Sequence, residues 1–211
     1  MPVLMRYLDR LAGLFLILLA RALTGAYANW RGCLPETRQR LYFANHTSHL
    51  DFLLLWAMLP PALRYRTRPV AGADYWETSP LRRYLIHRVF RGVLVERGRP
   101  SAGHNPLEPL QTALEAGDSL IFFPEGTRSP DGEMQAFKGG LYHLIRDNPQ
   151  VEFVPVRIEN LSRVMPKGGF VPVPLICILS FGTPVALQEE ESKPDFLARA
   201  RQAVLDMQPK P

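Results

Sequence analysis

Short apolar runs alternate with amphipathic segments along most of this 211-residue chain. The apolar runs have the length of buried strands and lie at residues 40–44, 92–96, 119–123, 152–158 and 175–181. Patterns of helical period lie at residues 49–58, 80–90, 106–116, 137–147 and 194–207. Strands that alternate with helices predict an α/β fold, a single domain whose central mixed or largely parallel sheet is flanked by helices.

The apolar run at residues 11–20 precedes this alternation and is flanked by Arg10 and Arg21. It is shorter than the roughly 20 apolar residues that a helix needs to cross a bilayer. No small-residue cleavage site follows it, so it fits a secretory signal peptide poorly. We expect a membrane-associating helix embedded in one leaflet, with a buried core helix and a tilted span as alternatives. Residues 1–35 then form this helix and its connection, and residues 36–211 form the folded domain.

Composition adds a basic character to this picture. The formal net charge is +5, carried almost wholly by arginine, and nine arginines but only three acidic residues lie between positions 64 and 99. Such a segment suits a solvated surface, anionic lipid headgroups, a phosphorylated substrate or an acidic carrier protein. No recognised nucleic-acid-binding motif accompanies the charge, so no nucleic acid is expected. Cys33 and Cys177 lie far apart without a Cys-x-x-Cys pattern, which indicates two packing thiols in a reduced compartment.

The most informative stretch is residues 45–51, Asn-His-Thr-Ser-His-Leu-Asp, directly after the first apolar run of the domain. A histidine whose ring is held by a carboxylate is a standard means of taking a proton from an alcohol near neutral pH. On one strand His46 and Asp51 would lie roughly 16 Å apart, and on one helix about 140° apart around the axis. A turn that leaves the strand at His46 and enters a helix near Ser48 brings them together, with Thr47 or Ser48 as the helix cap.

A second stretch, residues 123–129, reads Phe-Pro-Glu-Gly-Thr-Arg-Ser and also follows an apolar run. Gly126 permits a substrate to approach the backbone closely, and Thr127 and Arg128 can bind phosphate oxygens. Both stretches therefore lie where a strand gives way to a turn, which is the usual place for chemistry in α/β sheets.

Together the two stretches resemble the Asn-His-x4-Asp and Phe-Pro-Glu-Gly-Thr-Arg-Ser blocks of the glycerolipid acyltransferase family. Its best-known members are the 1-acyl-sn-glycerol-3-phosphate acyltransferases. Residues 92–97 and 154–158 resemble two weaker blocks of the family, with Leu or Val where the first of these usually has Phe. All four blocks follow the family's order, and the resemblance runs from about residue 36 to 185.

The resemblance implies a role for each residue of the site. His46 would be the general base, and Asp51 would hold its ring and stabilise the imidazolium. The second block would contribute to acceptor binding through Glu125, Gly126, Thr127 and Arg128. Arg97 matches the arginine that the family associates with the acceptor's phosphate, and Lys138 is a further candidate cation for it.

Two other kinds of chemistry are not favoured by the pattern. Ser48 lacks the Gly-x-Ser-x-Gly context of a nucleophilic serine, so capping is its expected role. His46, His49 and Asp51 do not have the spacing of a zinc motif, and we expect no metal and no cofactor. A thioester is reactive enough for direct attack by a bound alcohol, so nothing requires a covalent intermediate.

By this resemblance we expect a membrane-associated acyltransferase, placed at the cytoplasmic face of the cell membrane. It would move a fatty acyl chain from acyl-CoA or acyl carrier protein to 1-acyl-glycerol-3-phosphate, giving phosphatidic acid. One alternative is the same chemistry on another acceptor, such as a lyso-ornithine lipid or glycerol 3-phosphate. Another is a non-catalytic membrane-binding protein of the same fold.

Overall fold

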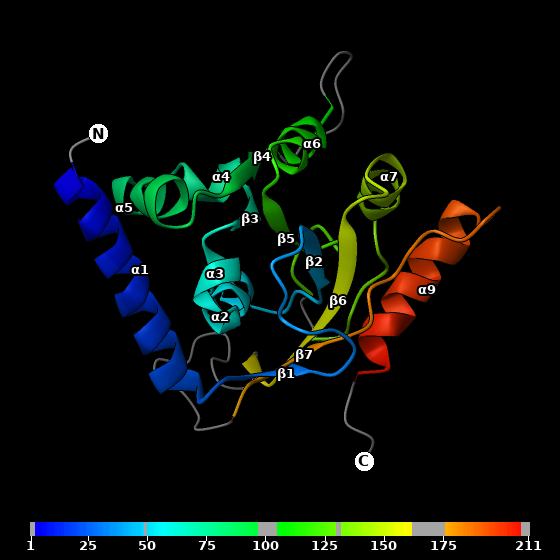
Figure 1. Cartoon of the computed structure of the whole chain (residues 1–211), viewed down its shortest axis with the longest axis horizontal. Helices are drawn as coiled ribbons and strands as arrows, with labels where there is room; N and C mark the ends of the chain where they lie inside the picture. The colour runs from blue at the N-terminus through cyan, green and yellow to red at the C-terminus, as the bar shows by residue number, and fades with distance from the viewer. Residues whose placement is uncertain (1–2, 49, 97–104, 130–131, 162–175, 208–211) are drawn as a thin grey trace.

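The computed structural model describes residues 3–48, 50–96, 105–129, 132–161 and 176–207 (Figure 1). Seven strands form one sheet in the order β1-β7-β6-β2-β5-β3-β4. The strands are β1 Tyr27–Trp30, β2 Arg40–Ala44, β3 Thr67–Gly72, β4 Val93–Val95, β5 Ser119–Phe122, β6 Glu152–Glu159 and β7 Ile178–Phe181. Strands β2 to β6 are parallel to one another, whereas β7 is antiparallel to β6 and parallel to β1. The expected α/β domain with a mixed, largely parallel sheet is confirmed.

Helices cover both faces of the sheet. They are α1 Val3–Thr24, α2 Asp51–Met58, α3 Pro61–Arg64, α4 Ala73–Trp76, α5 Pro80–Tyr84, the π-helical turn η1 Leu85–Val89, α6 Glu108–Glu115, α7 Gly140–Asp147 and α9 Lys193–Leu205. Figure 1 shows α1, α2 and α3 on one side of the sheet and α7 and α9 on the other. The core is correspondingly divided into two apolar clusters, one on each face.

Strand β2 contributes to both clusters. Tyr42 and Ala44 belong to the cluster beneath α1, α2 and η1, while Leu41 and Phe43 belong to the cluster beneath α6, α7 and α9. Successive side chains of a strand point to opposite faces. A central parallel strand therefore needs an uninterrupted apolar sequence, which is why the run at residues 40–44 could be recognised.

Strands β1 and β3 were not expected. Strand β3 contains Pro69, and proline lacks the N–H that an interior strand uses. Pro69 pairs with β5 only, because the pairing of β3 with β4 begins at Val70. Strand β1 lies at the sheet edge, where Trp30 stacks on Phe181 with ring centroids 3.9 Å apart. It falls within residues 1–35 and joins the sheet of the folded domain.

The basic segment at residues 64–99 is not a uniformly charged surface, because one of its arginines is buried and others form ion pairs. Arg64 is buried, and its guanidinium donates to three carbonyls at the end of α2, those of Trp56, Ala57 and Leu59. Carbonyls at a helix end have no partner within the helix, and Arg21 also donates to that of Ala57 at 3.4 Å. Burial lowers the pKa of Arg64. Two further arginines form ion pairs at 2.8 and 2.9 Å: Arg68 with Asp118 and Arg88 with Asp9.

Helix α1 has two unlike faces. Toward the domain, a Cβ added at Gly13 would lie 3.4 Å from Trp56 and 3.5 Å from Val89, so the helix packs closely there. The opposite face exposes ten large apolar side chains: Leu4, Met5, Tyr7, Leu8, Leu11, Leu14, Phe15, Leu18, Leu19 and Leu23. Within the described residues, no helix combines the length and the apolar character that crossing a membrane requires.

Both cysteines are free thiols. Cys177 is buried just before β7, and burial, with a smaller effect of the Asp51 carboxylate, raises its pKa to about 11. Burial likewise raises the pKa of the half-buried Cys33. A thiol with a raised pKa is a poor nucleophile near neutral pH, so both side chains act as packing groups.

Candidate active site

The two sequence motifs meet at one edge of the sheet. Strands β2 and β5 are adjacent and parallel, with Phe43 opposite Phe122, so their carboxyl ends lie side by side. The chain leaves β2 toward His46 and leaves β5 toward Glu125. The resulting site lies at the carboxyl edge of a parallel sheet, the usual location of ligand sites in open α/β folds.

A turn between β2 and α2 brings His46 and Asp51 together, although the helix begins at Asp51 and not near Ser48. Asp51 is fully buried as the first residue of α2, and its Oδ2 lies 2.9 Å from His46 Nδ1. The same oxygen accepts the backbone N–H groups of Thr47 at 2.6 Å and Ser48 at 2.8 Å. Because Asp51 accepts at Nδ1, the proton of a neutral imidazole sits there and Nε2 is the basic nitrogen.

The predicted helix cap at Thr47 or Ser48 is wrong. Helix α2 begins at Asp51 with Leu50 in the N-cap position and no side-chain cap. The Ser48 hydroxyl instead accepts the N–H of Leu50 at 3.3 Å. Ser48 is therefore a turn residue, and its neighbour His49 lies outside the described residues.

The second motif holds the backbone of His46 on both sides. Glu125 Oε1 accepts the N–H of His46 at 2.7 Å, and Oε2 accepts the N–H of Gln135 at 2.9 Å. The N–H of Ser129 donates to the carbonyl of His46 at 2.9 Å. Glu125 is only 1% exposed, and burial raises its pKa although the two N–H donors oppose this. This placement differs from the acceptor contact expected for Glu125, because its carboxylate is used to position His46.

Two residues support the site in ways that the sequence analysis missed. The buried Asn45 side chain exchanges two hydrogen bonds with the backbone of Ile158, at 2.9 and 2.8 Å, and so fixes the end of β2 against β6. The His46 ring stacks on Phe123 with centroids 4.3 Å apart. Both residues lie within the recognised stretches, but neither contact follows from spacing along the chain.

A cavity of about 340 Å³ lies beside His46 at the carboxyl ends of β3, β4 and β5. Much of its wall is apolar and comes from these strands: Val70, Ala71, Val95, Phe122 and Phe123. Gly126, Thr127 and Lys138 contribute a polar part of the wall. The cavity thus offers a basic nitrogen, a positive charge and an apolar surface together.

Gly126 and Lys138 depend on each other. Gly126 has φ +74°, a left-handed conformation that favours glycine. A Cβ at this position would lie 2.7 Å from Lys138 Nζ, so only glycine lets the lysine side chain lie across the turn. The backbone N–H of Lys138 also donates to the carbonyl of Pro124 at 2.8 Å.

The other residues predicted for the site do not all line the cavity. Thr127 is exposed and lines the cavity, whereas Arg128 is exposed and is not among the described lining residues. Arg97 lies outside the described residues, although Glu96, directly before it, lines the cavity. Among the described lining residues, Lys138 is therefore the one with a full positive charge.

Comparison with known proteins identifies the family. The acyltransferase family profile matches residues 31–159, more than half of the chain, and the chain belongs to this family. A 1-acyl-sn-glycerol-3-phosphate acyltransferase of Limnanthes alba is 32% identical over 146 residues, 66% of this chain and 49% of that protein. The alpha form from Mus musculus is 32% identical over 150 residues, covering 69% of this chain and 50% of the mouse protein.

The fold has a counterpart of known structure. The crystal structure of the 1-acyl-sn-glycerophosphate acyltransferase of Thermotoga maritima matches with a TM-score of 0.71 and 22% identity. The match covers 96% of this chain and 83% of the Thermotoga chain. By contrast, the chain spans about half the length of the plant and mouse relatives above.

The placement of Glu125 leads to a prediction about stability. We expect Glu125→Gln to lower the free energy of unfolding by about 1–3 kcal/mol, because one acceptor oxygen becomes an NH2 group that faces a backbone N–H. Urea denaturation followed by circular dichroism measures this difference. Glu115→Gln, at an exposed position on α6, is the matched control and should change little. Equal stability of both variants would show that the Glu125 contacts are not needed to hold His46.

Proposed function

We propose that this protein transfers a fatty acyl chain from a thioester to the free hydroxyl of 1-acyl-glycerol-3-phosphate, producing phosphatidic acid. The observation that carries this proposal is the His46–Asp51 pair, with its 2.9 Å contact, at the wall of a partly apolar cavity. The names of the plant and mouse relatives support the same acceptor.

The proposed reaction needs no covalent enzyme intermediate. Nε2 of His46 takes the hydroxyl proton of the acceptor as its oxygen attacks the thioester carbonyl. Asp51 keeps Nδ1 protonated and stabilises the imidazolium that results. When the tetrahedral intermediate collapses, the C–S bond breaks, and the imidazolium returns the proton to the leaving thiolate. The products are the ester and a free thiol, and His46 is again neutral.

The acceptor's phosphate would lie near Lys138. The Lys138 ammonium crosses Gly126, which lines the same cavity as His46. A charge-assisted contact from this ammonium would hold the phosphate while the hydroxyl reaches the ring. Arg97, Arg128 and Thr127 would make secondary contacts with the same phosphate. Glu125 and Gly126 would maintain the shape of the turn that presents these groups. The apolar wall would hold the acyl chain, delivered by acyl-CoA or by acyl carrier protein.

The exposed face of α1 supports association with a membrane. Both the acceptor and the product reside in bilayers, and monomeric soluble proteins rarely expose a contiguous apolar face of this kind. We assign residues 1–35 to membrane attachment and its connection, with residues 36–211 as the acyltransferase domain. The cytoplasmic face of the cell membrane is the proposed location, since the donor thioesters are made in the cytoplasm.

A test of the base measures release of free thiol from acyl-CoA with lysophosphatidic acid as acceptor. We expect His46→Ala to lower turnover by at least about 10², the usual contribution of a general base. Asp51→Asn should also lower it strongly, because the imidazolium loses its anionic partner. His143→Ala, on α7 and not among the described residues that line the cavity, is the control. Thiol release by His46→Ala at the wild-type rate would show that His46 is not the base, whereas no thiol release by the wild-type protein would favour a non-catalytic, membrane-binding role.

A second test concerns the acceptor. Lys138→Ala should raise the apparent KM for lysophosphatidic acid about 10- to 100-fold, the equivalent of one charge-assisted contact. The KM for the thioester should change much less, and Lys193→Ala provides a control for loss of a lysine. The same panel should include glycerol 3-phosphate and a lyso-ornithine lipid. If the wild-type protein prefers the lyso-ornithine lipid, which has no phosphate, the proposed acceptor is wrong.

A third test concerns α1. The triple variant Leu11→Gln, Phe15→Gln, Leu18→Gln should detach the protein from phosphatidylcholine vesicles, because burying each apolar side chain contributes about 1.5–3 kcal/mol. These side chains are 58–64% exposed, so the fold should be unaffected. Leu34→Gln, at a leucine that is 67% exposed, is the control. Co-sedimentation with vesicles gives the partition coefficient, and an unchanged value for the triple variant would place the attachment surface elsewhere.

A further inference from the structure

A second cavity, of about 540 Å³, lies between α1 and the domain. It shares none of its described lining residues with the cavity beside His46. Tyr65 and Arg91, which line it, lie just before β3 and β4, near the amino ends of those strands. The cavity beside His46 lies at their carboxyl ends. The two cavities are therefore separate sites.

The second cavity is strongly basic. Four arginines line it against a single carboxylate, that of Asp9: Arg6, Arg10, Arg88 and Arg91. Asp9 already forms an ion pair within the protein, because its Oδ2 accepts from Nε and Nη2 of Arg88 at 3.2 and 2.9 Å. Among the described residues, neither Arg6 nor Arg10 has an acidic partner. Arg91 lies 3.9 Å from Oδ1 of Asp118, outside the cavity wall. Within the described residues, two positive charges of the wall, those of Arg6 and Arg10, are therefore not neutralised by a close ion pair.

Tyr65 positions two of these arginines. The Arg10 guanidinium lies over its ring at 6.0 Å, and Arg91 Nη1 donates to its carbonyl at 3.4 Å. Arg91 also has φ +52°, a conformation uncommon outside glycine. This conformation ends the helical turn η1, where the N–H of Gly92 donates to the carbonyl of Ile86 at 2.7 Å.

The other part of the wall is apolar and leads to the exposed face of α1. Gly13, Ile17, Trp56 and Val89 line the cavity beside the arginines. Leu14 lines it as well, and at 51% exposure it also belongs to the outer apolar face. A ligand that fits must have an anionic group next to an apolar part, and a free inorganic anion does not use this surface.

We propose that this cavity binds the phosphate-bearing headgroup of an anionic phospholipid, with the acyl chains of that lipid lying against α1. Arginine suits this ligand because its planar guanidinium matches two phosphate oxygens at once. The site would orient the domain on the membrane, which attachment by a single apolar helix does not do.

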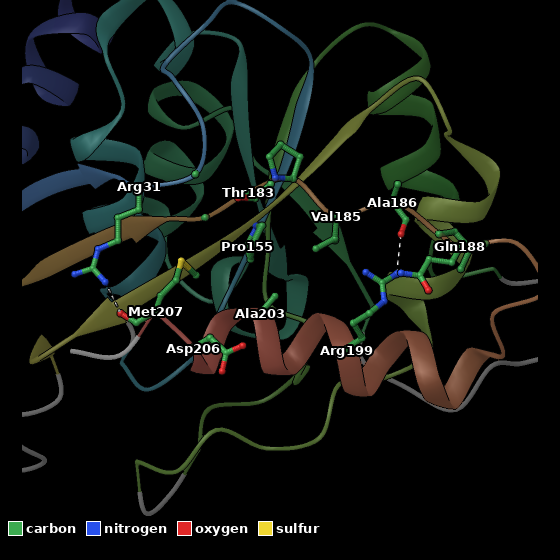
Figure 2. A pocket seen from close by; sticks show the side chains of 14 residues that line it. Arg31, Pro155, Thr183, Val185, Ala186, Gln188, Arg199, Ala203, Asp206 and Met207 are labelled. Carbon is green, nitrogen blue, oxygen red and sulfur yellow. Dashed lines mark hydrogen bonds between the residues drawn. The ribbon is translucent and has the colours of Figure 1, made fainter. Parts of the chain in front are cut away.

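A third hollow, of about 570 Å³, lacks these properties. It lies between α9 and the segment after β7, and Figure 2 shows its two arginines directed at backbone carbonyls. Arg31 donates to the carbonyl of Met207, and Arg199 donates to that of Ala186 and pairs with Glu191. Both of its arginines therefore already form contacts within the protein.

The first experiment measures partition of the full-length protein onto phosphatidylcholine vesicles with and without phosphatidylglycerol. General attraction of one arginine to an anionic membrane corresponds to about a fivefold change in partition. We expect Arg10→Gln and Arg6→Gln each to lose clearly more than this on the anionic vesicles and nothing on the neutral ones. Arg21→Gln, on the same helix outside the cavity, should lose about fivefold or less. Equal losses for all three variants would overturn the proposal.

The second experiment uses a soluble anionic lipid, dihexanoyl phosphatidylglycerol, added to the full-length protein in neutral detergent. We expect saturable binding that changes the fluorescence of Trp56, so that the signal is absent from Trp56→Phe and weakened in Arg10→Gln. Inorganic phosphate at the same concentration should neither bind nor compete, and dihexanoyl phosphatidylcholine should bind much more weakly. Equal binding of inorganic phosphate, or of the neutral lipid, would overturn the assignment to an anionic phospholipid.

Discussion

The carboxylate of Asp51 has no water to solvate it, because α2 and the sheet bury it completely, so neighbouring N–H groups have to take that role. Its Oδ2 accepts from the His46 ring and from the backbone of Thr47 and Ser48. Those three contacts shape the whole turn from β2 to α2. Oδ1 is buried without a hydrogen-bond partner in the described part of the chain. The buried carboxylate thus holds the ring of His46 and the backbone of the turn in one arrangement.

A second buried carboxylate, that of Glu125 in the second motif, has a different role. Glu125 accepts the N–H of His46, while Ser129 donates to the carbonyl of the same residue. The peptide groups on either side of His46 are thus fixed by the segment that follows the neighbouring strand β5. Because β2 and β5 are adjacent and parallel, neither segment has to be long. The two recognised blocks are consequently one structural unit, and the second supports the histidine of the first.

The sequence predicted what depends on local spacing and missed what depends on distant partners. The strand at residues 40–44 and the turn that joins His46 to Asp51 both follow from short-range pattern. The position of Glu125 depends on the pairing of two strands about 80 residues apart in the chain. Strand β3 was missed because Pro69 argues against an interior strand. Pro69 pairs with β5 alone, since the pairing of β3 with β4 begins only at Val70.

Several of the many arginines stabilise the interior of the protein. Arg64 satisfies three carbonyls at the end of α2, and the buried Arg40 pairs with Glu152 while donating to the carbonyl of Leu34. Both tasks use several N–H groups of one planar guanidinium, which lysine does not offer. The basic segment therefore contributes to the interior as well as to the surface. Arg6 and Arg10, which form no ion pair with any described residue, lie on α1 beside its apolar face, so positive charge and apolar surface lie together on this helix.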